Sequence, residues 1–93
     1  MRKYELMTIF PTEEDVCQTS LANVRGIFQE FGAEIEKEDF FGERELTYEV
    51  KKRNRGKFYL FNIKANPAKI IDIDHKFKLE SNLMKFMFVN IDE

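Results

Sequence analysis

A short basic run near the middle of the chain has the clearest potential for chemistry. Five of the seven residues from 51 to 57 are positively charged: Lys51, Lys52, Arg53, Arg55 and Lys57. The whole chain has a net charge of −2, so the residues outside this run carry −7. A basic cluster on an otherwise acidic chain favours a directed contact with phosphate groups over a nonspecific nucleic-acid coat. The alternative interpretation is a solvated turn.

Smaller basic groups lie near the two ends of the chain. Arg2 and Lys3 precede Tyr4, and Lys85 lies among apolar residues close to the C-terminus. These side chains suit further contacts with phosphate. For Lys85 the alternative is a charge that protects an edge strand from pairing with another chain.

Residues that suit catalysis are few. His75 is the one histidine and lies on a predicted helix surface, with no nucleophile placed beside it by spacing. The four glycines are scattered, so they form no phosphate-binding loop. Cys17 is the only cysteine, and we interpret it as a small packed residue of a helix. We therefore expect no enzyme activity, no catalytic residue, no metal site and no cofactor.

The length of 93 residues suits one domain, residues 1–93. Its 43% hydrophobic and 34% charged residues are typical of a folded chain with a mixed surface. No apolar run approaches the roughly 18–20 residues that span a bilayer, and we expect no membrane contact and no signal peptide. A single cysteine fits a reducing cytoplasm.

The spacing of apolar residues predicts six elements. They are strand 4–10, helix 12–31, strand 33–52 with a bulge at 40–42, strand 57–65, a helix beginning at Asn66 and Pro67, and strand 83–91. This order, β-α-β-β-α-β, predicts an α+β chain of the ferredoxin-like class, in which a four-stranded antiparallel sheet carries both helices on one face. Strands 4–10 and 57–65 are expected in the centre, because both of their faces are largely apolar.

Several local details follow from this assignment. Thr12 and Asn66 are the predicted helix N-caps. Gly26 is expected to let its helix approach the sheet closely, and Gly56 to adopt a positive φ in a hairpin turn at residues 53–56. Within strand 33–52, Leu46, Tyr48 and Val50 are expected to form one apolar face.

The face of the sheet away from the helices is expected to be apolar and to bind a partner. The residues assigned to this partner surface are Phe58, Leu60, Phe86 and Phe88. In the last strand the outward row is either the one with Met84, Phe86 and Phe88 or the one with Leu83, Met87 and Val89. Loops that cover the face, or a register shifted by one residue, are the alternatives.

Residues 42–52 resemble the signature of the bacterial small-subunit ribosomal protein S-six family, and residues 1–5, 57–61 and 82–87 resemble its start, third strand and last strand. The resemblance implies a protein of the small (30S) ribosomal subunit that binds the central domain of small-subunit ribosomal RNA. It also implies a heterodimer with ribosomal protein S-eighteen, on ribosomes in the cytoplasm. Arg2, Lys3, Tyr4, the basic run and Lys85 match regions that contact RNA, and Phe58 and Leu60 match positions that meet the partner protein.

Two other binding functions suit the same order of elements. A stand-alone RNA-recognition module is the first, since residues 55–61 faintly resemble its third-strand motif. Such modules stack bases on sheet aromatics, whereas Lys57 stands here in place of the first stacking aromatic residue. A small-molecule regulatory domain is the second and weaker alternative.

Overall fold

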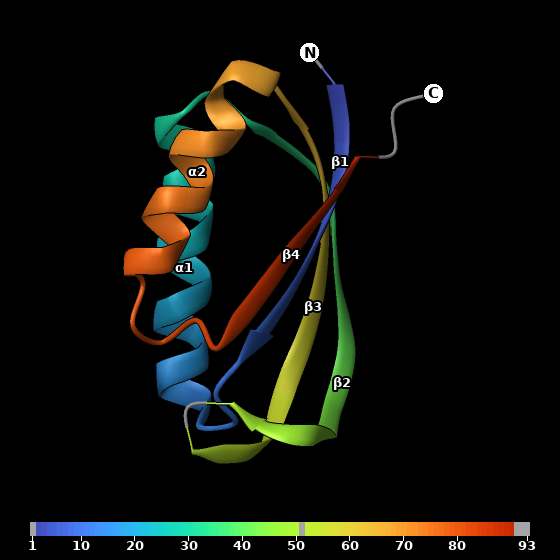
Figure 1. Ribbon diagram of the computed structural model, residues 1–93, viewed down its shortest axis with the longest axis vertical. Coiled ribbons are helices and arrows are strands. Elements are labelled where there is room, and N and C mark those ends of the chain that lie inside the picture. The colour runs from blue at the N-terminus through green and yellow to red at the C-terminus, as the bar shows by residue number, and fades with distance from the viewer. Residues whose placement is uncertain (1, 51, 91–93) are drawn as a thin grey trace.

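The computed structural model describes residues 2–50 and 52–90, with the side chains of residues 89 and 90 excepted. These residues form β1 (Arg2–Phe10), α1 (Glu14–Glu30), β2 (Glu34–Val50), β3 (Arg53–Ala65), α2 (Pro67–Leu79) and β4 (Lys85–Asn90). The strands make one antiparallel sheet in the order β2-β3-β1-β4. Both helices cover the same face of the sheet (Figure 1), so the ferredoxin-like prediction is confirmed. The predicted last residue of the final strand, Ile91, lies outside the described residues.

The core lies between the helices and the sheet. Alternate residues of the two central strands point toward the helices and are fully buried: Leu6 and Phe10 of β1, and Phe61 and Ile63 of β3. The ring of Phe28 on α1 meets Phe61 edge-on at a centroid distance of 5.7 Å. Burial of each such side chain contributes about 1.5–3 kcal/mol, which explains why β1 and β3 occupy the centre of the sheet.

The two helices begin in different ways. Asn66 caps α2 as predicted, because its Oδ1 accepts a hydrogen bond from the Ala68 N–H at 3.0 Å. The prediction that Thr12 caps α1 is wrong, since the N-cap residue is Glu13 and it makes no side-chain cap. The Glu13 carboxylate instead accepts a hydrogen bond from Arg53 of β3 at 2.7 Å. A contact with a distant strand thus takes the place of the local cap.

The hairpin between β2 and β3 turns earlier than predicted. Val50 ends β2 and pairs with Arg53, the first residue of β3, and Lys52 between them has a φ of +64°. The prediction of a turn with Gly56 at positive φ is therefore wrong. Gly56 lies buried inside β3, where an added Cβ would be 2.4 Å from the Ile9 Cγ2. The glycine allows β3 to lie close to the Ile9 side chain of β1.

β2 is long and irregular, as predicted. Its pairing with β3 shifts between Phe40 and Gly42, and Gly42 has a φ of +99°, which confirms the predicted bulge. A further shift follows Glu45, and pairing resumes only at Val50. Residues 46–49 therefore lie outside the ladder, and this end of β2 bends across the bottom of the sheet (Figure 1).

Gly56→Ala is expected to lower the free energy of unfolding by about 1–3 kcal/mol, because the new methyl group overlaps the Ile9 side chain. Gly26→Ala is the matched control. The prediction that Gly26 brings α1 close to the sheet is wrong, since an added Cβ there has nothing within 4 Å. This variant should raise the free energy of unfolding by about 1 kcal/mol through helix propensity. Urea unfolding measures both, and equal effects would contradict the role given to Gly56.

Candidate partner and nucleic-acid surface

One half of the sheet face opposite the helices is apolar. The register brings Met7 and Ile9 of β1 beside residues of β3 and β4 whose side chains also point away from the helices. Their neighbours along each strand belong to the core, and side chains alternate between faces. The apolar members are named the open-face patch: Met7, Ile9, Phe58, Leu60 and Met87.

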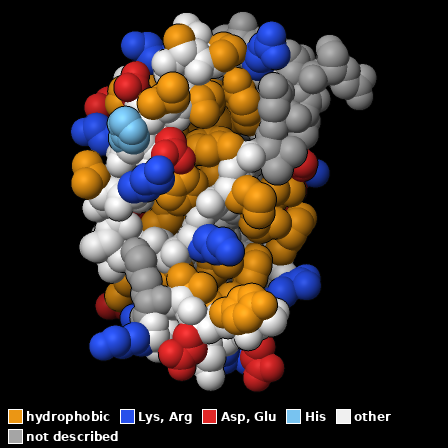
Figure 2. Space-filling model, viewed as in Figure 1, with side chains coloured by type: hydrophobic (Ala, Val, Ile, Leu, Met, Phe, Trp, Pro, Cys, Tyr) orange, Lys and Arg blue, Asp and Glu red, His pale blue; other side chains and the backbone are white. Residues whose placement is uncertain are grey.

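The open-face patch is accessible but has a limited extent. Met87 is its most exposed member at 56%, and the others are half-buried or buried. Figure 2 shows hydrophobic side chains gathered on both sides of β4. At the other end of the same face, Glu5 lies opposite Asn62 and Lys3 opposite Lys64. The predicted apolar face is therefore confirmed for one half of the sheet and wrong for the other half.

Phe86 and Phe88 lie on the helix side of β4. Both are opposite β1 residues that are fully buried under the helices. Their rings pack around Phe77 of α2 at centroid distances of 5.3 and 6.0 Å. The prediction that this row faces outward as part of the partner surface is wrong, and the row with Met87 faces outward instead.

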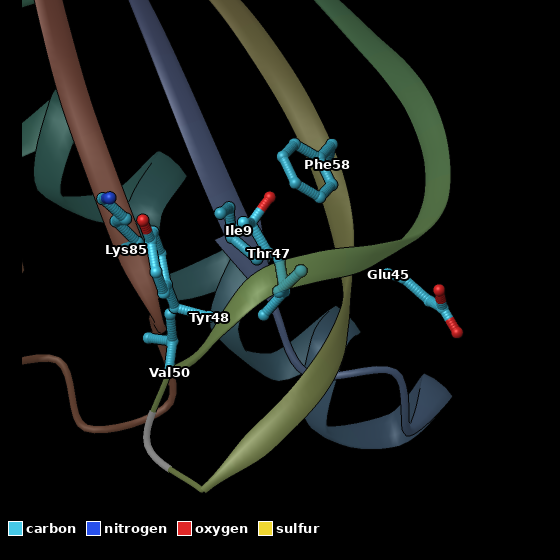
Figure 3. Close-up of a pocket in the computed structure, with 8 residues that line it drawn as sticks. Ile9, Glu45, Thr47, Tyr48, Val50, Phe58 and Lys85 are labelled. Carbon is cyan, nitrogen blue, oxygen red and sulfur yellow. The ribbon is translucent and has the colours of Figure 1, made fainter.

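A cavity of about 320 Å³ lies where the end of β2 crosses the open face (Figure 3). Ile9 of β1 and Phe58 of β3 line it from the sheet, and Lys85 lines it from β4. Thr47 and Tyr48 line it from the end of β2. A second cavity of about 210 Å³ shares Ile9, Phe58 and Lys85 and extends to Met7, Phe86 and Met87. The two cavities make this end of the face a concave surface.

Tyr48 is the lining residue that the sequence pattern missed. Its alternation with Leu46 and Val50 predicts a place on one apolar strand face, yet Tyr48 is 80% exposed. The reason is the shift in pairing after Glu45, which takes residues 46–49 out of the ladder. Alternation predicts the orientation of a side chain only while its strand remains paired.

The basic run is partly neutralised by carboxylates. Three of its members form ion pairs: Arg53 with Glu13 at 2.7 Å, Lys57 with Glu14 at 2.5 Å and Arg55 with Glu43 at 3.1 Å. Lys52 is exposed, and no carboxylate of the described residues lies within ion-pair distance of it. Lys51 lies outside the described residues. The predicted cation cluster is therefore smaller than its sequence suggests, and its contact with phosphate stays a prediction.

These ion pairs affect titration. A hydrogen bond from Arg53 lowers the pKa of Glu13, and a hydrogen bond from Lys57 lowers the pKa of Glu14. Both carboxyl groups are near the start of α1, where the helix dipole also favours negative charge. The acidic start of α1 is thus attached to the basic start of β3.

Of the three N-terminal candidates, two remain at the surface. Arg2 and Lys3 are exposed at the start of β1. Tyr4 is only 7% exposed, and its ring lies edge-on to Phe88 at a centroid distance of 6.5 Å. The Tyr4 side chain therefore belongs to the core and leaves little ring surface for RNA, and its predicted contact with RNA stays a prediction.

The groups considered for catalysis do not come together. His75 is exposed on α2, and Cys17 is buried on α1, where burial raises the pKa of its thiol. Within residues 2–50 and 52–90, no three His, Cys, Asp or Glu side chains are grouped as a metal site would require. Neither α1 nor α2 is both long enough and apolar enough to span a bilayer.

Comparison with known proteins gives consistent matches over the whole chain. A family model described as ribosomal protein S6 matches residues 3–90. Small ribosomal subunit protein bS6 of Treponema denticola is 44% identical over 93 residues, which are 100% of both chains. The proteins of the same name from Treponema pallidum (strain Nichols) and Clostridium novyi (strain NT) are 42% and 32% identical, over 99% and 97% of both chains.

Solved structures share the fold. The crystal structure of 30S ribosomal protein S6 from Thermotoga maritima matches with a TM-score of 0.85 and 21% identity, covering 96% of this chain and 86% of that one. The C-terminal domain of the MgtC protein from Mycobacterium tuberculosis matches with a TM-score of 0.63 and 7% identity, covering 100% of this chain and 90% of that one. A fold that is present in both proteins does not by itself indicate a function.

Arg53→Gln is expected to raise the pKa of Glu13 toward its ordinary value, because the hydrogen bond that stabilises the charged carboxylate is lost. The pKa of Glu14 should stay low, since its partner Lys57 is unchanged. Lys57→Gln is the reciprocal control and should raise the pKa of Glu14 alone. Titration of the side-chain carboxyl carbons by NMR measures both groups. If the two pKa values are unmoved, the paired arrangement is wrong.

Proposed function

The chain belongs to the ribosomal protein S6 family, and on this premise we propose that it binds the central domain of small-subunit ribosomal RNA as a heterodimer with ribosomal protein S-eighteen. Family membership makes it a protein of the small ribosomal subunit. Its expected place is the ribosome in the cytoplasm. Two sets of side chains suit the two contacts: the open-face patch for the protein and exposed cations for the RNA.

The open-face patch is the observation that carries the proposal. Phe58 and Leu60 are half-buried on the face that neither helix covers, and Met87, across Met7 from Leu60, is 56% exposed. Contiguous apolar surface of this kind is typical of a protein interface. A protein partner that covers the patch removes it from water, at about 25 cal/mol for each Å² of apolar surface buried.

The RNA contact depends on cations that no carboxylate neutralises. Lys3, Lys52 and Lys85 are exposed, and in the described part of the chain no carboxylate lies within ion-pair distance of them. They lie at the start of β1, at the hairpin turn and on β4. Arg53 and Lys57 are already paired with α1, so a phosphate has to displace a carboxylate before either can bind it. We therefore expect the salt dependence of RNA affinity to come mainly from the unpaired lysines.

The alternative of a stand-alone RNA-recognition module fits this arrangement less well. Lys57 is opposite Phe10 and bonds to Glu14, so its side chain is on the helix side of the sheet. The position where such a module stacks a base on β3 is thus turned away from the open face.

Leu60→Asp is expected to abolish heterodimer formation while the chain stays folded, because a buried unpaired carboxylate is unfavourable at an apolar interface. Ile71→Asp is the matched control, since Ile71 is 66% exposed on α2, on the opposite side of the sheet. Isothermal titration with the purified partner measures binding, and circular dichroism confirms folding. Binding that survives Leu60→Asp would place the interface elsewhere.

Lys52→Ala is expected to weaken binding of the heterodimer to the central-domain RNA and to reduce the slope of log affinity against log salt by about 1. Arg55→Ala should have a smaller effect, because Glu43 already neutralises Arg55. Filter binding at several salt concentrations measures the slopes. An unchanged slope for Lys52→Ala would mean that Lys52 does not contact RNA and would favour the interpretation of the turn as a solvated loop.

A further inference from the structure

The end of β2 presents an aromatic ring that the fold itself does not use. Tyr48 is 80% exposed and lies in the stretch 46–49 that has left the ladder with β3. None of the ring contacts among the described aromatic side chains includes Tyr48, whereas Tyr59 on β3 meets both Phe10 and Phe40. Burial of the Tyr48 ring therefore contributes little to folding, and the ring is available to a ligand.

The cavity beside this ring combines three kinds of surface. Ile9 and Phe58 form an apolar floor, Tyr48 stands at one side, and Lys85 lies next to Tyr48 (Figure 3). Glu45 also lines the cavity, but its side chain points away from the other labelled residues. The volume of the cavity, about 320 Å³, is close to the lower limit for small-ligand pockets, about 300 Å³. One flat aromatic group fits such a space.

Charge indicates what kind of group enters. Lys85 is exposed, and no described carboxylate lies within ion-pair distance of it. It is opposite Ile9 and shares its face of β4 with Met87, two residues further on, so this cation lies beside apolar side chains. A phosphate complements this cation, and a base complements the ring and the apolar floor.

We infer that the Tyr48–Lys85 cavity holds one unpaired nucleotide of ribosomal RNA, with its base stacked on the Tyr48 ring and its phosphate bound by Lys85. This inference rests on the proposed function and assigns a site within it. Sequence-specific RNA binding commonly uses unstacked bases held against aromatic side chains. The rest of the open-face patch, toward Leu60, has no unpaired cation and stays assigned to the protein partner.

The test compares Tyr48→Leu, which keeps apolar bulk without the aromatic face, with Tyr48→Phe, which keeps the ring. The heterodimer is titrated with a central-domain fragment of small-subunit ribosomal RNA at fixed salt. Tyr48→Leu should weaken binding by about 5- to 150-fold, the range for loss of one base–aromatic stack, and Tyr48→Phe by less than about 2-fold. Circular dichroism checks the fold, which an 80% exposed side chain should leave unchanged.

The cation is tested separately. Lys85→Gln should reduce the salt slope of RNA binding by about 1, and Lys85→Arg should retain it. Lys69→Gln is the matched control, because Lys69 is exposed on α2 and far from the open face. Its slope should equal that of the unchanged protein.

The outcomes separate this inference from the proposed function. If Tyr48→Leu weakens heterodimer formation in the absence of RNA, the protein partner occupies the cavity and the nucleotide site is wrong, while the proposed function stands. If RNA binding is the same for Tyr48→Leu and Tyr48→Phe, no base stacks on the ring and the inference is overturned. If the unchanged heterodimer does not bind the RNA, the proposed function is wrong, and the nucleotide site that rests on it is wrong as well.

Discussion

Two helices can bury only one face of a four-stranded sheet, so the second face must be polar or be covered by another molecule. Side chains alternate along a strand, so each core residue of β1 has a neighbour that points the other way. In one half of β1 these outward neighbours are Lys3 and Glu5, which are polar and suit water. In the other half the outward residues, such as Ile9 and its β3 partner Phe58, are apolar and contribute nothing to packing under the helices. An apolar half of an otherwise polar face is the surface that the proposed function assigns to a partner molecule.

The sequence predicted the order of elements and the central strands because these depend on strong local patterns. It did not predict which side chains of β4 point toward the helices. Phe86, Met87 and Phe88 are all apolar, so no alternation of polar and apolar residues distinguishes the two faces of the strand. The choice is made by pairing with β1, where Phe86 and Phe88 meet core-facing partners. Tyr48 was missed for a related reason, because an apolar alternation gives no sign that its strand has left the ladder.

Clustering of charge along the chain differs from clustering of charge in space. Five cations within seven residues predict a strongly positive turn, but Glu13 and Glu14, about 40 positions earlier, are brought beside Arg53 and Lys57. The same contact explains the wrong cap, because the Glu13 side chain binds Arg53 and does not cap α1. Both errors come from tertiary contacts between the start of α1 and β3, which no local pattern contains.

The misplaced hairpin turn has a different source. Gly56 is buried inside β3, and the sequence alone does not distinguish a buried glycine from a glycine in a turn.

If the chain binds RNA as proposed, the distribution of unpaired charge favours one part of the open face for that contact. The first half of β2 forms one edge of the sheet, where Glu34 is exposed and Glu36 and Glu38 are paired with Lys64 and Arg25. Lys37 of this stretch is paired with Asp39, so this edge offers phosphate no unpaired cation. Three exposed lysines of the sheet and its hairpin turn have no carboxylate partner among the described residues: Lys52 at the turn, Lys85 on β4, and Lys3 at the opposite end of the open face. On the proposed function, RNA is expected at the end of the open face where β2 bends across the sheet, because two of these three lysines lie at that end. The register that turns Lys85 outward is the same one that turns Met87 outward, so one pairing of β4 with β1 sets the apolar surface and the cation side by side.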